Sequence, residues 1–167
     1  MINLKTPFSE EDITQLKVGD VVSISGWIYC GRDAVLPKIV KHVEEGTLSD
    51  MNIDLQGCVI FHTAVSPAGV GPTSSNKLEI ENSFEPLSKA GVKMHLGKGA
   101  IKPETVKALA KNNAVFAIIP PVTALLESQT SEREVVCYPE LGMEAFHRIK
   151  VNNFQAIIAA AHGESIY

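Results

Sequence analysis

Three short segments of the sequence place glycine beside cationic or hydroxyl side chains, a combination that can bind an anion. Each follows a stretch typical of a β-strand, and ligands of α/β sheets bind beyond the carboxyl ends of strands. If the segments meet there, Arg32, Lys77 and Lys98 form a cationic pocket, which suits a dicarboxylate better than an uncharged ligand. Thr73 and Ser74 would add hydroxyl groups to that pocket. The segments are Gly31-Arg32-Asp33, Gly71-Pro72-Thr73-Ser74-Ser75-Asn76-Lys77 and Gly97-Lys98-Gly99.

Each segment also has a purely structural explanation. Arg32 can be a solvated charge and Asp33 the cap of the following helix, while the other two segments can be ordinary turns. The second segment lacks the spacing of a phosphate-binding P-loop, and the third is not a dinucleotide fingerprint. No local motif sets a base beside the hydroxyls of residues 73–75, which disfavours a stand-alone enzyme with a hydroxyl nucleophile.

The cysteines and histidines of the sequence predict no metal site and no disulfide. Three cysteines at wide spacings fit neither a disulfide framework nor a CxxC knuckle, so we expect reduced, partly buried thiols. No histidine lies at metal-ligand spacing from another histidine or a cysteine. The residues are Cys30, Cys58 and Cys137, and His42, His62, His95, His147 and His162.

Length and composition indicate one globular domain spanning residues 1–167. Apolar residues make up 45% of the chain and charged residues 20%, which is ordinary for a folded protein. The net charge of -4 argues against a nucleic-acid partner, since such proteins usually carry a basic excess. No apolar run reaches the ~20 residues of a membrane span, and the N-terminus lacks the apolar region of a signal peptide. We therefore expect a cytoplasmic protein without a membrane partner.

Predicted helices and strands alternate through most of the chain, and several strands follow at its end. This order favours an α/β layered domain with a mixed sheet. Helices are predicted from Ser9, over 35–45 with a stop at Gly46, over 84–90 and over 103–112. Strands are predicted over 21–25, 27–30, 57–61, 92–96, 114–119, 135–138, 145–151 and 156–161, and the segment SPAGVGPTSSN is predicted as a loop.

Four segments, in matching order and spacing, resemble the class I iron–sulfur fumarate hydratases and L(+)-tartrate dehydratases. GRDAVLPKIVKHVEEG resembles their GRDAAHKR-type segment, and GPTSSNKLE resembles their GPTT-x-x-RMD loop. LGKGAI resembles their GKG loop, and LGMEAFHRIKVNNFQAII resembles their GMEA-type strand. The resemblance runs from about Gly26 to Tyr167. In size the chain is similar to the separate β subunit, which is equivalent to the C-terminal domain of the fused enzymes.

This resemblance implies a β/β/α swivelling domain that supplies half of an active site. It implies that the [4Fe-4S] cluster is carried by a separate α subunit, so that this chain binds no cofactor itself. The expected assembly is a hetero-oligomer with that α subunit, and a homodimer of the chain alone stays open. The implied substrate is a small dicarboxylate, either fumarate/malate or tartrate/oxaloacetate.

The resemblance also implies roles for individual residues. Arg32 and Lys98 would clamp substrate carboxylates, and Thr73 matches the threonine taken as the catalytic base. A threonine hydroxyl is too weakly acidic for that role unless nearby cations favour the alkoxide. The implied substrate-binding set is Arg32, Asp33, Gly71, Pro72, Thr73, Ser74, Lys77 and Lys98.

Three departures from the family pattern leave the substrate open. Lys77 stands where the motif has arginine, so a bidentate fork becomes a point charge. Ser74 stands for a second threonine, and Leu36-Pro37 replaces a His-Lys pair. A methylated fumarate or another 2-hydroxy diacid is therefore compatible with the sequence. The alternative is a divergent, non-catalytic subunit that binds carboxylates or regulates a partner.

Overall fold

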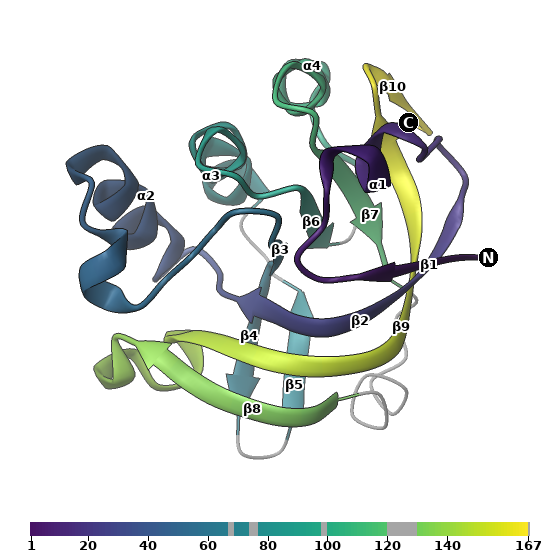
Figure 1. Ribbon diagram of the computed structural model, residues 1–167. Coiled ribbons are helices and arrows are strands. Elements are labelled where there is room, and N and C mark those ends of the chain that lie inside the picture. Colours follow the sequence, from purple (N-terminus) through teal and green to yellow (C-terminus); the bar gives the residue numbers. More distant parts are fainter. Residues whose placement is uncertain (67–68, 74–76, 98–99, 120–129, 167) are drawn as a thin grey trace.

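The fold is built around a closed ring of five strands. The computed structural model describes residues 1–66, 69–73, 77–97, 100–119 and 130–166 (Figure 1). Strands β2, β3, β6 and β7 are parallel neighbours, and β9 runs antiparallel to both β2 and β7, which closes the ring. The ring strands are Val21–Cys30, Val59–Phe61, Met94–Gly97, Val115–Ile118 and Phe146–Ala161 in chain order.

Five further strands lie outside this ring in the described structure. β1 pairs parallel with β2, while β8 and β10 pair antiparallel with β9. β4 and β5 form a separate antiparallel hairpin between β3 and α3. These strands are Ile2–Lys5, Thr63–Ser66, Gly69–Thr73, Thr130–Cys137 and Glu164–Ser165 for β1, β4, β5, β8 and β10.

Three helices cover one outer side of the barrel. Figure 1 shows α2, α3 and α4 in a row on that side, with α3 packed between the other two. The predicted α/β class with a mixed sheet is confirmed, although the closure of the sheet was not predicted. The helices are α1 Glu10–Thr14, α2 Leu36–Glu45, α3 Lys77–Lys89 and α4 Pro103–Lys111, with 3-10 turns η1 Leu48–Met51 and η2 Pro139–Glu144.

Local sequence signals set some helix ends and miss others. Ser9 caps α1 as predicted, in a capping box with Asp12. Gly46 ends α2 in the left-handed region, with φ of 69°. The prediction that Asp33 caps α2 is wrong, because that helix begins two residues later and Val35, its N-cap residue, makes no side-chain cap. Instead, hydrogen bonds from backbone N–H groups to the Arg32 carbonyl form the turn that leads into α2.

Several predicted elements are longer than their patterns suggested. The two strands predicted before residue 31 are the single strand β2, with a register shift near Gly26. The last two predicted strands form the 16-residue strand β9. Helix α3 begins seven residues earlier than predicted and contains Pro86, whose cost is offset by the buried side chains of Phe84 and Leu87. The prediction that SPAGVGPTSSN is entirely loop is wrong, because Gly69–Thr73 within it forms β5 and pairs with β4.

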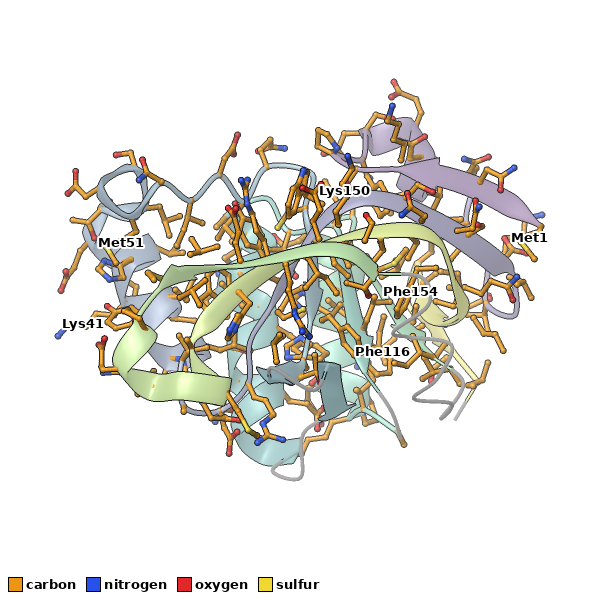
Figure 2. All side chains as sticks on the ribbon, turned by 90° about the horizontal axis from the view of Figure 1, so that it is seen from below. Met1, Lys41, Met51, Phe116, Lys150 and Phe154 are labelled. Atoms are coloured by element: carbon orange, nitrogen blue, oxygen red, sulfur yellow. The ribbon has the colours of Figure 1, made fainter. Side chains whose placement is uncertain are left out.

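The main apolar core fills the barrel. Phe61 and Phe154 meet there edge to face, with ring centroids 5.8 Å apart. Smaller apolar clusters lie between the barrel and the helices, and Phe116 belongs to the one under α4. Figure 2 shows Phe154 and Phe116 among the side chains between the ribbons, with Met1 at the periphery. Among the described residues, no helix is long and apolar enough to cross a bilayer.

Candidate functional site

Parallel neighbouring strands bring the starts of the predicted loops to one edge of the barrel. The Gly31 N–H donates to the Phe61 carbonyl at 3.0 Å, and the His62 N–H donates to the Leu96 carbonyl at 3.0 Å. The chain segments that follow β2, β3 and β6 therefore leave from adjacent positions. The glycine before Arg32 is required by packing, since a Cβ at Gly31 would lie 2.8 Å from Val35 Cγ1. The predicted residue Lys98, which follows β6, lies outside the described residues.

The β4–β5 hairpin returns the second predicted segment to the same edge. Thr63, two residues after β3, is the backbone partner of Thr73 in β5. Gly71 and Pro72 belong to the same strand, and Lys77 is the first residue of α3. Ser74 lies outside the described residues. The fold thus gathers the backbone of residues 71–73 and the Arg32 turn at neighbouring strand ends.

Arg32 is held by a carboxylate to which the sequence assigned no role. Its Nε donates to Oε2 of Glu144 at 2.7 Å, and its Nη2 forms an ion pair with the same oxygen. Asp33 lies farther away, with its Oδ1 3.8 Å from Arg32 Nε. Glu144 is the last residue of η2 and belongs to the GMEA segment. No local pattern could have revealed the contact, because the two residues are 112 positions apart.

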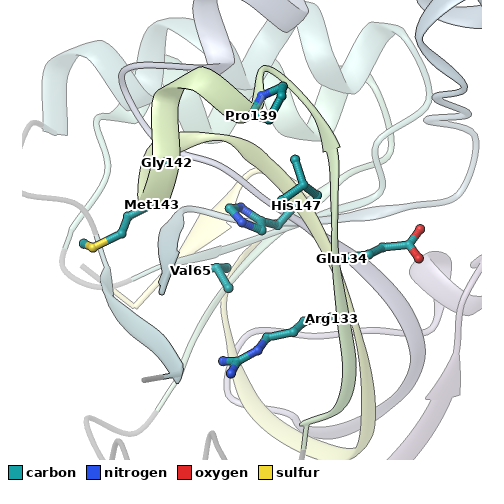
Figure 3. A pocket seen from close by; sticks show the side chains of 8 residues that line it. Val65, Arg133, Glu134, Pro139, Gly142, Met143 and His147 are labelled. Carbon is teal, nitrogen blue, oxygen red and sulfur yellow. The ribbon is translucent and has the colours of Figure 1, made fainter. Parts of the chain in front are cut away.

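A pocket of about 430 Å³ opens beside this edge, between β4, β8, η2 and β9. His147 pairs with Cys30 across β9 and β2, so the pocket wall begins where β2 ends. Figure 3 shows the His147 imidazole in the middle of the pocket, with Met143 across from it. The lining residues are Val65, Arg133, Glu134, Val135, Pro139, Gly142, Met143 and His147.

His147 presents a neutral acceptor to that pocket. Its Nδ1 donates to the Ala145 carbonyl at 2.9 Å, which leaves Nε2 as the acceptor nitrogen. Burial lowers the pKa of His147, and the nearby Arg133 lowers it too, whereas the bond to Ala145 raises it. The exposed side chains of Met143 and Val135 on the same rim form the apolar surface that a partner could cover.

A pair of histidines lies buried between the barrel and α3. His62 Nε2 is 3.0 Å from His95 Nδ1, and His95 Nε2 is 3.0 Å from the Ser88 hydroxyl. Burial lowers the pKa of His62, and that of His95 to about 3. The Nδ1 of His62 has no hydrogen-bond partner among the residues that the structure describes. The sequence did not predict this pair, which its members form across β3 and β6.

The donor set of the chain does not fit an iron–sulfur cluster. A cluster of this kind needs several cysteine thiolates around it. Cys30, Cys58 and Cys137 are buried thiols, and burial raises the pKa of each, that of Cys137 to about 11. Within the described ranges, no three His, Cys, Asp or Glu side chains form a group that could hold a metal.

Comparison with known proteins gives one family. The model described as "Fumarase C-terminus" matches residues 1–167. The chain is 32% identical over 174 residues to a protein described as L(+)-tartrate dehydratase subunit beta from Methanocaldococcus jannaschii, covering 95% of this chain and 87% of that protein. It is 30% identical over 177 residues to the L(+)-tartrate dehydratase subunit beta of Escherichia coli K12, covering 98% and 85%. It is 31% identical over 180 residues to a protein described as a class I fumarate hydratase from Geobacillus stearothermophilus, but spans only 34% of that protein.

Proposed function

This chain belongs to the fumarase C-terminus family, and we propose that it is the β subunit of a hydro-lyase that adds water to, or removes water from, a small dicarboxylate. In this proposal an α subunit completes the active site and carries the [4Fe-4S] cluster. The observation that carries the proposal is the Arg32 guanidinium, fixed at the strand edge to which β5 returns residues 71–73.

Arg32 binds one substrate carboxylate in the proposed site. Its Nε and Nη2 contact Glu144, and the guanidinium has a second pair of N–H groups, along its Nη1–Nη2 edge, that matches a carboxylate. Lys98 and Lys77 are proposed as the cations for the remaining substrate charge, with Asp33 beside the clamp. The backbone of Gly71 and Pro72 and the hydroxyl of Ser74 complete the proposed contacts.

Thr73 is proposed to move the proton on the substrate carbon next to the reacting one. The removal of such a proton builds negative charge on the adjacent carboxylate, which nearby cations stabilise. The same cations favour the Thr73 alkoxide over the hydroxyl. The proposal therefore requires Thr73 and at least one cation of the site to act together.

A non-catalytic carboxylate-binding subunit is the second candidate. The observation that favours it is the side chain of Leu36, which is buried where the family motif has a polar pair. Pro37 in the first turn of α2 likewise offers no polar group. The Arg32 site would then bind a dicarboxylate without turnover.

Anaerobic co-expression with an α subunit tests both candidates. The complex is assayed for the hydration of fumarate and methylated fumarates and the dehydration of tartrate. We expect turnover only in the complex, and its loss in Arg32→Ala and Thr73→Ala. Arg148→Ala is the control, because Arg148 also pairs with a glutamate but lies exposed on β9 over Trp27. A complex that binds dicarboxylate but turns over none of these substrates would favour the second candidate.

A further inference from the structure

We infer that Glu144 is a positioning residue, which orients the Arg32 guanidinium so that one edge faces the substrate. The inference rests on the proposed function and names a residue that the proposed site does not include. Both Arg32 contacts fall on one carboxylate oxygen of Glu144, one from Nε and one from Nη2. Two contacts from the Nε–Nη2 edge to one oxygen turn that edge towards Glu144 and leave the Nη1–Nη2 edge to face a ligand. The opposite nitrogen, Nη1, contacts no carboxylate among the described residues.

Glu144 can act in this way because the backbone on both sides of it is fixed. The Ala145 N–H donates to the Gly142 carbonyl at 3.0 Å, and the Ala145 carbonyl accepts from His147 Nδ1. Ala145 and Phe146, which follow Glu144, are buried in the described structure. The carboxylate is therefore presented from a short anchored turn rather than from a loose surface segment.

The Arg32–Glu144 pair is more buried than those ion pairs of the described residues that join two exposed side chains. The side chains of Arg32 and Glu144 are 23% and 22% exposed, whereas those of Arg148 and Glu134 are 40% and 50% exposed. Solvent screens a partly buried pair less than an exposed one. The Glu85–Lys89 pair on α3, whose side chains are 47% and 58% exposed and do not line the pocket, is therefore the control ion pair.

Two roles for Glu144 predict opposite effects on substrate binding. As a positioning group it improves binding, because an arginine already ordered loses less side-chain entropy when the substrate arrives. As a mere negative charge it weakens binding of a dianionic substrate through repulsion. Removal of the carboxylate therefore distinguishes the two by the direction of the change in KM.

The first experiment measures kinetics of the α/β complex with the substrate that the wild-type complex turns over. In Glu144→Ala and Glu144→Asp, we expect KM to rise about five- to tenfold, the cost of re-ordering one long side chain, with kcat within about twofold. Glu144→Gln keeps an acceptor oxygen at the right length, and its KM should rise less than that of Glu144→Asp. Glu85→Gln, in the exposed Glu85–Lys89 pair, should leave both constants unchanged. A KM that falls or stays constant in Glu144→Ala overturns the inference, as does a fall in kcat accompanied by a lower Tm.

The second experiment requires no activity. In the full chain alone, the proton on Arg32 Nε should exchange slowly with water by NMR, and this protection should disappear in Glu144→Ala while the backbone spectrum is retained. Fast exchange in the wild-type chain would overturn the inference. If Arg32→Ala leaves KM unchanged, the proposed role of Arg32 fails. If Arg32→Ala raises KM but Glu144→Ala does not, only the positioning role fails.

Discussion

The imidazoles of His62 and His95 share one hydrogen bond beneath α3, with His62 Nε2 3.0 Å from His95 Nδ1. Only one of these two nitrogens carries the proton of that bond. The hydrogen bonds that link His62, His95 and Ser88 are therefore all donated in the same direction, either towards Ser88 or towards His62. Phe84 covers the pair, stacked on His95 with ring centroids 4.3 Å apart. A proton added to either ring would place a charge in an apolar site, and both rings stay neutral.

The buried pair should make the protein acid-sensitive. Burial lowers the pKa of His95 to about 3, so below pH 6.5 the unfolded chain binds a proton that the native chain does not. The free energy of unfolding should therefore fall as pH falls from 6.5 towards 3, by about 2 kcal/mol per histidine between pH 6.5 and 5. Urea unfolding at both pH values measures this. His95→Gln should reduce the drop, and exposed His162→Gln should not.

Two glycines with similar backbone angles should respond differently to alanine. Gly57 has φ of 74°, and an added Cβ would lie 2.6 Å from the Phe8 carbonyl oxygen. Gly46 has φ of 69° and nothing within 4 Å of that position. Gly46→Ala should cost about 1 kcal/mol from backbone strain alone, and Gly57→Ala about 3 kcal/mol or more, because the backbone must also move. If Gly46→Ala and Gly57→Ala lower the free energy of unfolding in urea equally, the close packing around Gly57 is contradicted.

Glu10 should stabilise the fold through a buried cation. Lys93, whose side chain is 7% exposed, places its Nζ 2.6 Å from Glu10 Oε1. The hydrogen bond from Lys93 lowers the pKa of Glu10 most, followed by that from Asn113. Glu10→Gln should lower the free energy of unfolding by about 1–2 kcal/mol, since the ammonium loses its counter-ion. Glu11→Gln, in the same helical turn, is the control and should change it less.

The isolated chain should not assemble an iron–sulfur cluster. Cluster ligation needs thiolates, and burial raises the pKa of Cys30, Cys58 and Cys137. After anaerobic reconstitution with iron and sulfide, we expect no cluster absorbance and no iron retained after desalting. Cys137→Ser should behave like the wild type. If the wild-type chain retained stoichiometric iron and Cys137→Ser did not, this chain would bind the cluster itself. That result would contradict the assignment of the cluster to the α subunit.

Local patterns predicted the elements of this fold better than their connections. The capping serine at Ser9 and the stop at Gly46 act within one helical turn, so the sequence reveals them. The closure of the barrel depends on β9 pairing with both β2 and β7, which is a contact between distant segments. The continuity of β9 was missed because Asn152-Asn153 resembles a turn, and Asn153 does adopt a φ of 53° within the strand.

The site was predictable to the extent that strand ends define it. The rule that ligands bind at the carboxyl ends of parallel strands located Arg32 and the backbone of Thr73 at one edge. Ser74 and Lys98 remain predictions, because they lie outside the described residues. Glu144 and His147 could not be predicted as site residues, since their contacts depend on how β9 pairs with β2.

The position of β9 has a consequence for synthesis of the protein on the ribosome. β9 is the strand that closes the ring between β2 and β7, yet it is made after the four other strands of that ring. While it is still unmade, β2 and β7 each lack a partner strand, and the apolar side chains of the barrel stay accessible. The barrel of the nascent chain must therefore remain open until β9 has been made, and until then β2 and β7 each expose one strand edge.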